Sequence, residues 1–285
     1  MAGNERDPCR DLVETDDRDR ALSLVFAPEA ARADLAALYA FNVEVARVRD
    51  QISQPLPGEI RLQWWRDVIG GTAAEEEDVG GGGEAGHPVA SRLVEAIARH
   101  RLPVAAFDRM LEARIFDVYD DPMPSHEHFE AYAGETASTL IVLAATILSP
   151  SGADRIADAA GHAGVAQTAA GVLRLLPIHR ARGQVYLPAD ILAAAGCTAP
   201  QLLAGEVEPS GRAIAAMVAY GREHAAKARA LFADVPREVR AAFLPALLAA
   251  PYLDRIERAG AGVLRQPPDL SAPRKAFQFW RWMRG

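Results

Sequence analysis

The sequence predicts an all-α fold, and three observations support this. Alanine, the strongest helix former, is abundant along the chain. Apolar residues recur at steps of three and four, as they do on one face of a helix. Alternating apolar and polar runs joined by hairpin dipeptides are missing. With 285 residues, 50% of them hydrophobic, the chain is long enough to form a sizeable core.

The first predicted helices precede an acidic, glycine-rich segment. Pro28 and Glu29 suit the first turn of a helix that runs to about residue 52. Its apolar stripe consists of Leu35, Leu38, Phe41, Val45 and Val48. A second helix, "GEIRLQWWRDVIGG", ends at Gly70 and Gly71.

Further helices are predicted after that segment. The one at 153–176 is rich in alanine and glycine, so we expect it to be central, where small residues let helices approach closely. The predicted ranges are about 89–101, 103–119, 125–148, 153–176, 189–195, 211–233, 237–259 and 273–284.

The composition divides the chain into three parts. Residues 1–17 are predicted to be a flexible N-terminal tail, 18–270 a single helical domain, and 271–285 a basic, aromatic C-terminal helix. Within the domain, residues 72–88 are expected to be a flexible loop insertion, because helical sequence resumes on both sides.

Charge and cysteine content exclude several classes of protein. A net charge of −7 argues against nucleic-acid binding, which needs a basic surface. Cys9 and Cys197 form neither a disulfide framework nor a C-x-x-C zinc motif, which favours a reducing, cytoplasmic setting. The acidic N-terminus does not resemble a signal peptide, and no apolar run is long enough to predict a membrane-spanning helix.

No metal site is predicted from spacing alone. Aspartate pairs four residues apart share a helix face, but each pair lies in the tail or at a helix end, where acidic residues are common. His126 and His128 are two apart and cannot face the same side of a helix. The aspartate pairs are Asp7/Asp11, Asp117/Asp121 and Asp154/Asp158.

Three stretches together resemble the squalene/phytoene synthase family over about residues 18–260. The first contains Tyr-Ala-Phe at 39–41 and continues to "LQWWRD". The second is "YAGETASTLIVLAATIL". The third is "GVLRLLPIHRARGQVYLPADIL", with Arg-Gly-x-Val-Tyr-Leu-Pro at 182–188.

The resemblance implies an isoprenoid-synthase-like helical bundle around a central cavity. Two aspartate-rich helices would face each other across its mouth and hold Mg²⁺ ions that neutralise the diphosphates of two prenyl substrates. Active members carry a D-D-x-x-D-like run soon after Tyr-Ala-Phe and an Asp-x-x-x-Asp before the Arg-Gly motif.

This chain departs from both aspartate motifs. At the first, Ala46 and Arg47 stand where carboxylates are expected, and Asp50 remains. At the second, the positions are Leu175 and His179, with the helix-breaking Pro177 between them. We therefore expect no catalytic residues, no bound metal and no cofactor, with Mg²⁺ required only if prenyltransferase activity survives.

The non-catalytic branch of the family includes a mitochondrial respiratory complex I assembly factor, and "LRLLPIHRARGQVYLPADIL" with "LQWWRD" resembles that branch most. The resemblance implies a scaffold whose partners are complex I subunits or assembly intermediates. The alternative is a prenyl-diphosphate-binding protein or a divergent prenyltransferase, with an isoprenoid ligand. Its pocket would be formed by Tyr39, Arg174, Arg180, Arg182 and Tyr186, with His179 as acid or base.

The C-terminal segment "PRKAFQFWRWMRG" mixes cations and aromatic rings, a composition suited to the inner face of a membrane. Lys275, Trp280, Arg281 and Trp282 are the candidate contacts for a peripheral association. The alternative is a terminal helix that docks its aromatic side chains on the bundle.

Overall fold

The structure is a computed structural model that describes residues 7–71 and 86–284. All regular elements in these ranges are helices, so the all-α prediction is confirmed. The first half comprises α1 (Pro8–Asp16), α2 (Arg18–Leu24), α3 (Glu29–Ala46), η1 (Val48–Gln51), α4 (Pro55–Gly70), α5 (Pro88–His100), α6 (Val104–Val118), α7 (His126–Ala133), η3 (Gly134–Ser138) and α8 (Thr139–Leu148). The second half comprises α9 (Pro150–Ala153), α10 (Ala157–Arg174), α11 (Leu176–Ala181), α12 (Ala189–Ala194), α13 (Ala199–Ala204), α14 (Val207–Leu231), η4 (Phe232–Asp234), η5 (Arg237–Phe243), α15 (Leu244–Leu247), α16 (Ala249–Ala259), η6 (Gly260–Leu264) and α17 (Ala272–Arg284).

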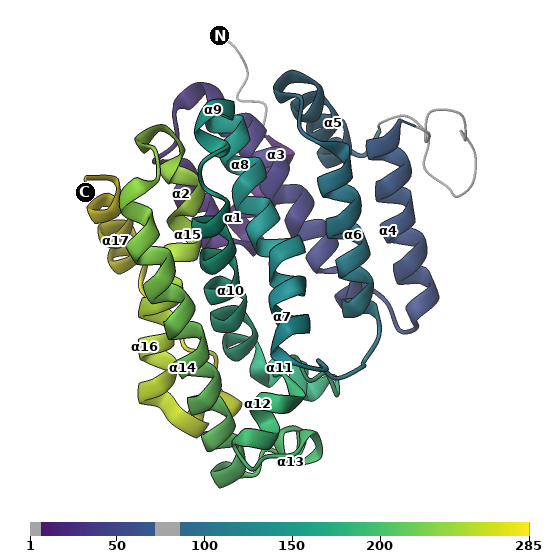
Figure 1. Cartoon of the computed structure of the whole chain (residues 1–285). Helices are drawn as coiled ribbons and strands as arrows, with labels where there is room; N and C mark the ends of the chain where they lie inside the picture. Colours follow the sequence, from purple (N-terminus) through teal and green to yellow (C-terminus); the bar gives the residue numbers. More distant parts are fainter. Residues whose placement is uncertain (1–6, 72–85, 285) are drawn as a thin grey trace.

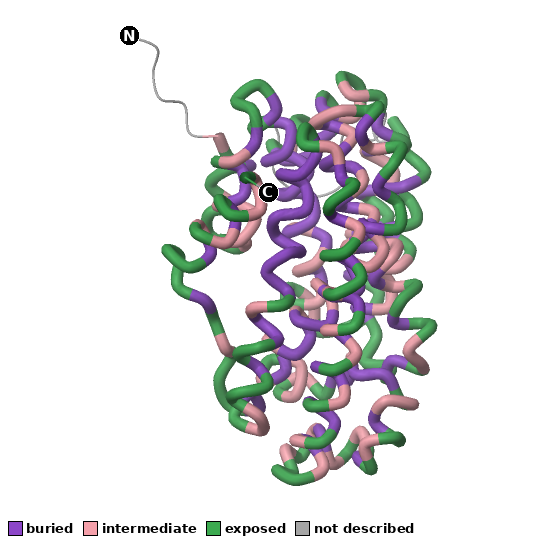
Figure 2. Tube along the Cα trace, turned by 60° about the vertical axis from the view of Figure 1, so that its left-hand side comes forward, coloured by how far each residue is buried: buried purple, intermediate pink, exposed green. Residues whose placement is uncertain are grey.

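The helix α10 lies at the centre of the bundle, as its small residues predict (Figure 1). It contacts α14 and α16 on one side and α7, η3 and α8 on the other. Ten of its residues are buried, most of them alanine, and the buried trace runs down the middle of the molecule (Figure 2). Close helix packing around α10 therefore fixes the positions of the surrounding helices.

Part of the predicted N-terminal tail is an ordered helix, so that prediction needs correction. Asp7 caps α1 by accepting a hydrogen bond from the backbone N–H of Cys9, and Pro8 occupies the first turn. Cys9 and Val13 are buried, and α1 packs on α3. The segment is acidic, and its two buried side chains, Cys9 and Val13, are too few to predict the helix from the sequence.

Several predicted boundaries also change. Of the predicted loop 72–88, residues 72–85 lie outside the described residues, and Pro88 begins α5. The predicted helix 125–148 is interrupted by the π-helical turn η3, and 237–259 divides into η5, α15 and α16. Pro177 does not strain a continuing helix. It lies in the first turn of a new helix, α11, where the missing N–H carries no penalty.

The segment His126–Leu148 is long and apolar enough to cross a membrane, by length and composition alone. It has 23 residues and a mean hydropathy of 1.4, and half of the apolar window is buried in the bundle. Its last part, α8, packs on α3 and η5. Because core helices pass the same test, packing within the bundle accounts for this apolar character.

A pair of glycine substitutions on α10 tests its central packing. A Cβ at Gly164 would lie 2.6 Å from the backbone nitrogen of Ser138, whereas a Cβ at Gly161 meets nothing within 4 Å. We expect Gly164→Ala to lower the free energy of unfolding by about 1–3 kcal/mol through overpacking. The control Gly161→Ala should be neutral, or stabilising by up to about 1 kcal/mol. Urea unfolding measures both, and equal effects would contradict the packing described.

Candidate functional site

A cavity of about 520 Å³ opens between the N-terminal helices and the centre of the bundle. Both segments that carry the expected motif positions line it. Ala46 and Arg47 come from the end of α3, and Leu175 and His179 come from the junction of α10 and α11. The family resemblance implies that the two motif segments face each other across the mouth of a cavity. In the structure both segments line the same cavity.

Five aspartates line this cavity, and each of them faces a cation of the same chain. Two belong to the corner between α1 and α2. Asp16 forms an ion pair with Arg47, and Asp17 forms one with Arg20. A metal-binding carboxylate is expected at position 47. Arg47 instead places a positive charge beside Asp16. The five are Asp16, Asp17, Asp19, Asp117 and Asp269.

Asp117 is the most enclosed of the five. Arg114 donates to it at 2.9 Å, and the hydroxyls of Tyr132 and Tyr186 each donate to it at 2.9 Å. The Asp117 and Arg114 side chains are only 8% and 13% exposed, so water screens this ion pair little. Every oxygen of this carboxylate is satisfied within the protein.

Asp19 and Asp269 form a second group in the cavity lining. Lys275 lies 2.7 Å from Asp19 and 3.0 Å from Asp269, and the Tyr252 hydroxyl donates to both. The Arg174 guanidinium stacks 3.8 Å from the centre of the Tyr252 ring. Its terminal nitrogens lie 3.6 and 3.7 Å from the two carboxylates. Residues far apart in the sequence thus form one charge-balanced cluster.

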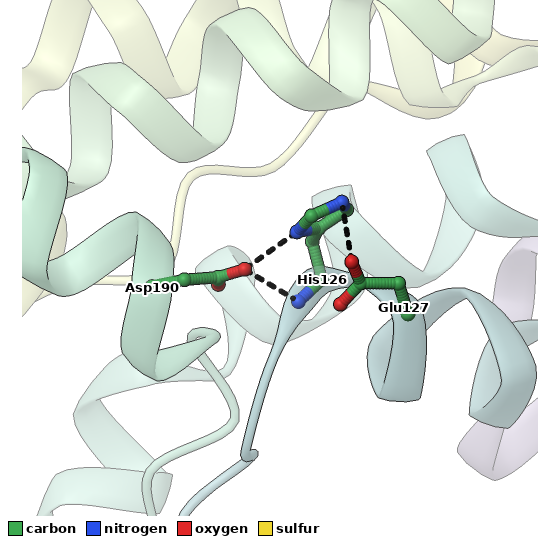
Figure 3. Close-up of side chains that lie close together, drawn as sticks. All are labelled: His126, Glu127 and Asp190. Atoms are coloured by element: carbon green, nitrogen blue, oxygen red, sulfur yellow. Dashed lines mark hydrogen bonds and ion pairs between the residues drawn. The ribbon is translucent and has the colours of Figure 1, made fainter.

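Among the described residues, one group of three potential metal ligands has its ligand atoms within 4.8 Å of one another, and it lies outside the cavity lining. Figure 3 shows the His126 ring between two carboxylates. Its Nδ1 faces Asp190 and its Nε2 lies 3.2 Å from Glu127. The hydrogen bond to Asp190 raises the pKa of His126. Each ring nitrogen faces a carboxylate, so this group joins α12 to the start of α7.

His179 contributes a neutral ring to the cavity. It lies 4.5 Å from the Tyr186 ring, centre to centre, and its Nδ1 is buried without a hydrogen-bond partner. Burial lowers the pKa of His179 to about 4. At neutral pH the position therefore carries no charge, and it provides neither a metal-binding carboxylate nor a cation.

Of the predicted pocket residues, Arg174 and Tyr186 line the cavity and three others do not. Tyr39 is buried beneath Arg20, with its pKa raised to about 12 by burial. Arg180 donates to the backbone carbonyls of Leu202, Leu203 and Leu264. Arg182 pairs with Asp50, the remaining acid of the first motif. Arg180 thus connects α11 to the backbone at Leu202, Leu203 and Leu264. Arg182 connects the second motif segment to Asp50 of the first.

The four candidate membrane contacts in the C-terminal helix differ in their exposure to solvent. Lys275 is buried in the cavity wall, so it cannot contact a membrane. Trp282 packs edge-on against Phe232 at 5.1 Å, as a docked helix requires. Trp280 and Arg281 are exposed. Trp280 stacks with Phe277, which is 57% exposed. The exposed face of α17 is therefore Phe277, Trp280, Arg281 and Arg284.

The model of the squalene/phytoene synthase family matches residues 13–274. The chain belongs to the squalene/phytoene synthase family. Two solved structures share the fold: a squalene synthase HpnC from Alicyclobacillus acidocaldarius and a dehydrosqualene synthase in complex with ligand. The TM-scores are 0.70 and 0.76, with 22% and 16% identity. Each superposition covers at least 88% of this chain and at least 92% of the other. At such identities the likeness shows the fold alone.

Three other proteins are more similar in sequence. A rat protein named NADH dehydrogenase (ubiquinone) complex I, assembly factor 6, is 30% identical over 279 residues, covering 96% of this chain and 81% of the rat protein. The human protein of that name is 29% identical over the same shares. A Drosophila melanogaster homologue is 30% identical over 88% of this chain.

The sequence reasoning missed the second charge cluster of this family member. Asp19 falls next to the predicted tail, Asp269 precedes the C-terminal helix, and the sequence predicts Lys275 as a membrane contact. One signal was available: the run "DDRDR" at residues 16–20 places alternating charges at the first turn of a helix. Nothing in the sequence indicates that Lys275 reaches it.

The neutral state of His179 makes stability depend on pH. As pH falls through 6.5 the unfolded chain takes up a proton, whereas the folded protein resists until about pH 4. Stability is therefore lost as pH falls between these values, by at most about 3 kcal/mol. We expect His179→Gln to lose less stability than the wild type between pH 7.5 and 4.5 in urea unfolding. An equal loss in both proteins would show that His179 is not held neutral.

Proposed function

We propose that this chain is a non-catalytic member of its family that supports the assembly of respiratory complex I. The absence of catalysis is inferred from one observation: every aspartate of the cavity forms an ion pair with a cation of the chain. The named assembly factors, similar over almost the whole chain, support the role in complex I assembly. Its partners would be complex I subunits or assembly intermediates.

Mg²⁺-dependent condensation needs carboxylates that are free to bind the ion. In this cavity the ion would have to displace Arg47 from Asp16 and Lys275 from Asp19, and the second pair is the more enclosed, with side chains 8% and 16% exposed. The neighbouring motif positions offer an apolar side chain at Leu175 and a neutral ring at His179. The residues at both motif positions therefore favour the loss of the metal site. We propose neither a cofactor nor a metal for this chain.

A second candidate is a prenyl-diphosphate-binding protein or a divergent prenyltransferase of isoprenoid biosynthesis. The observation in its favour is the open cavity with Arg174 and Arg114 in its wall. Charge-assisted hydrogen bonds from these groups suit a phosphate oxygen. Both arginines already face carboxylates, which favours the scaffold over this alternative.

Two assays together test the proposed role. In a strain of the source organism that lacks this chain, we expect less assembled complex I and lower NADH:quinone oxidoreductase activity in membranes, both restored by the wild-type chain. The purified protein with farnesyl or geranylgeranyl diphosphate and Mg²⁺ should form no squalene or phytoene. Unchanged complex I would remove the assembly role, and robust product formation would remove the non-catalytic one.

We further propose a cytoplasmic protein that associates peripherally with the inner membrane face through the exposed side of α17. Phe277 and Trp280 form a stacked apolar pair, and Arg281 and Arg284 supply positive charge without an acid on the helix. Such a face suits anionic lipid head groups above an apolar layer.

The double variant Phe277→Ser/Trp280→Ser should lose most binding to vesicles of phosphatidylcholine and phosphatidylglycerol in co-sedimentation. Vesicles of phosphatidylcholine alone should bind the wild type weakly, because the arginines need anionic lipid. The control Val104→Ser/Val207→Ser removes exposed apolar side chains elsewhere and should leave binding unchanged. Point variants are preferable to truncation, since Lys275 and Phe279 are buried. Wild-type binding by the Phe277/Trp280 variant would reject this contact surface.

A further inference from the structure

A second pocket, of about 190 Å³, lies beside the C-terminal helix and shares no lining residue with the cavity described above. Its lining comes from α10, α14, α15, α16 and α17, and α17 lies at the outer edge of the bundle (Figure 1). Part of the lining is made of buried alanines, which offer only apolar side-chain contact. They are Ala163, Ala166, Ala228 and Ala246.

The charged residues of this pocket leave an excess of positive charge. Arg229, Arg274 and Arg281 line it, and Asp254 is the one acid in the described lining. Asp254 lies 2.6 Å from Arg222, which is outside the lining, so its charge is already balanced. None of the three lining arginines has an ion-pair partner among the described residues. An anion in this pocket would therefore be bound without breaking an existing pair.

The helical spacing of α17 places its polar side chains on the pocket side. Arg274, Gln278 and Arg281 are separated by four and three residues, so they share one face of the helix. From α14, the Arg229 guanidinium lies over the Trp282 ring, 5.5 Å from its centre, and Trp282 also lines the pocket. Cations from two helices thus surround one pocket, and the guanidinium group matches the geometry of phosphate oxygens.

The pocket adjoins the proposed membrane contact. Phe277 and Trp280, the stacked and exposed pair, lie about a quarter turn around α17 from the face that carries Arg274 and Arg281. The three pocket arginines are exposed, which suits a ligand presented at a membrane surface. Pockets for drug-sized ligands measure about 300–1,000 Å³, so this smaller one suits a head group better than a protein segment.

We infer that this pocket binds the phosphate of an anionic phospholipid head group, which is held by Arg229, Arg274 and Arg281. The inference rests on the proposed peripheral association with a membrane and names the lipid group that α17 and α14 recognise. An acidic protein segment would be attracted by the same charges. The small volume and the neighbouring aromatic pair favour the lipid.

Soluble short-chain lipids test the pocket without a membrane, by isothermal titration calorimetry below their critical micelle concentration. The probes are dihexanoylphosphatidylglycerol, dihexanoylphosphatidylcholine, inorganic phosphate and a hexaglutamate peptide. We expect the phosphatidylglycerol to bind at least about tenfold more tightly than each of the others. The choline cation would add positive charge beside the arginines, and inorganic phosphate lacks the glycerol and acyl contacts. Equal binding of phosphate would assign the pocket to free anions, and tighter binding of the peptide would assign it to a protein partner. Either result would overturn the inference.

Paired charge substitutions locate the binding site. Arg229→Gln/Arg274→Gln removes two pocket cations and should weaken binding of the phosphatidylglycerol at least about tenfold. The control Arg155→Gln/Arg265→Gln removes the same charge from exposed arginines outside the lining, and should change the affinity less than about twofold. Equal losses in the two variants would show a general effect of net charge and would reject the pocket.

A second pair of variants changes volume and leaves the charge unaltered. Ala250→Phe fills the pocket from an exposed lining position and should weaken binding about tenfold, whereas Ala226→Phe, exposed on α14 outside the lining, should not. Circular dichroism and thermal unfolding establish that each variant folds. Full affinity in a folded Ala250→Phe variant would place the lipid elsewhere.

The calorimetry and the vesicle assay fail independently. If the soluble phosphatidylglycerol does not bind while the wild type still sediments with anionic vesicles, the pocket is rejected and the membrane contact is retained. If the soluble lipid binds as expected while the wild type does not sediment with vesicles, the peripheral association is rejected and the pocket is retained.

Discussion

The balance of charge around the cavity is the constraint on which the rest of this structure depends. Five aspartates line one cavity of the helical bundle, and opposite charge balances them; the need is greatest at Asp117, which is buried, since an unpaired buried carboxylate is strongly unfavourable. Family members that use Mg²⁺ would supply it as a metal ion. This chain supplies it from its own arginines and a lysine. The resulting ion pairs also connect distant elements: Asp16 and Arg47 join α1 to α3, and Asp19 and Lys275 join α2 to α17.

This replacement changes what the cavity can do without closing it. An ion pair is fixed in one geometry, whereas a bound metal retains ligand positions for substrate oxygens. The space itself remains, with a volume of about 520 Å³. Under the proposed function, the cavity is retained while the chemistry of diphosphate departure is lost.

Patterns of apolar and small residues within single helices predicted most of the fold. The helical spacing of apolar residues in α3 and the small residues of α10 each determined an element and its burial, because these signals lie within one helix. The tail prediction failed at α1, where two buried side chains, Cys9 and Val13, are too few to give a periodic signal. The interruption at η3 was also beyond prediction from a continuous apolar run.

The site was less predictable, for a physical reason. Resemblance located Ala46, Arg47, Leu175 and His179, but ion pairs depend on how helices distant in sequence meet. Lys275 has the same sequence context whether it faces lipid or Asp19. Only the docking of α17, through Phe279 in the core, decides between them.

The central claim is that no carboxylate of the cavity is free to bind a divalent ion. Titration of Mn²⁺ followed by electron paramagnetic resonance tests this directly, because protein-bound Mn²⁺ loses the sharp six-line spectrum of the aqueous ion. The account predicts that the spectrum of free Mn²⁺ persists at millimolar concentration, with or without farnesyl diphosphate, while a metal-dependent squalene synthase depletes it. Stoichiometric Mn²⁺ binding that is abolished by Asp16→Asn or Asp19→Asn would contradict the account.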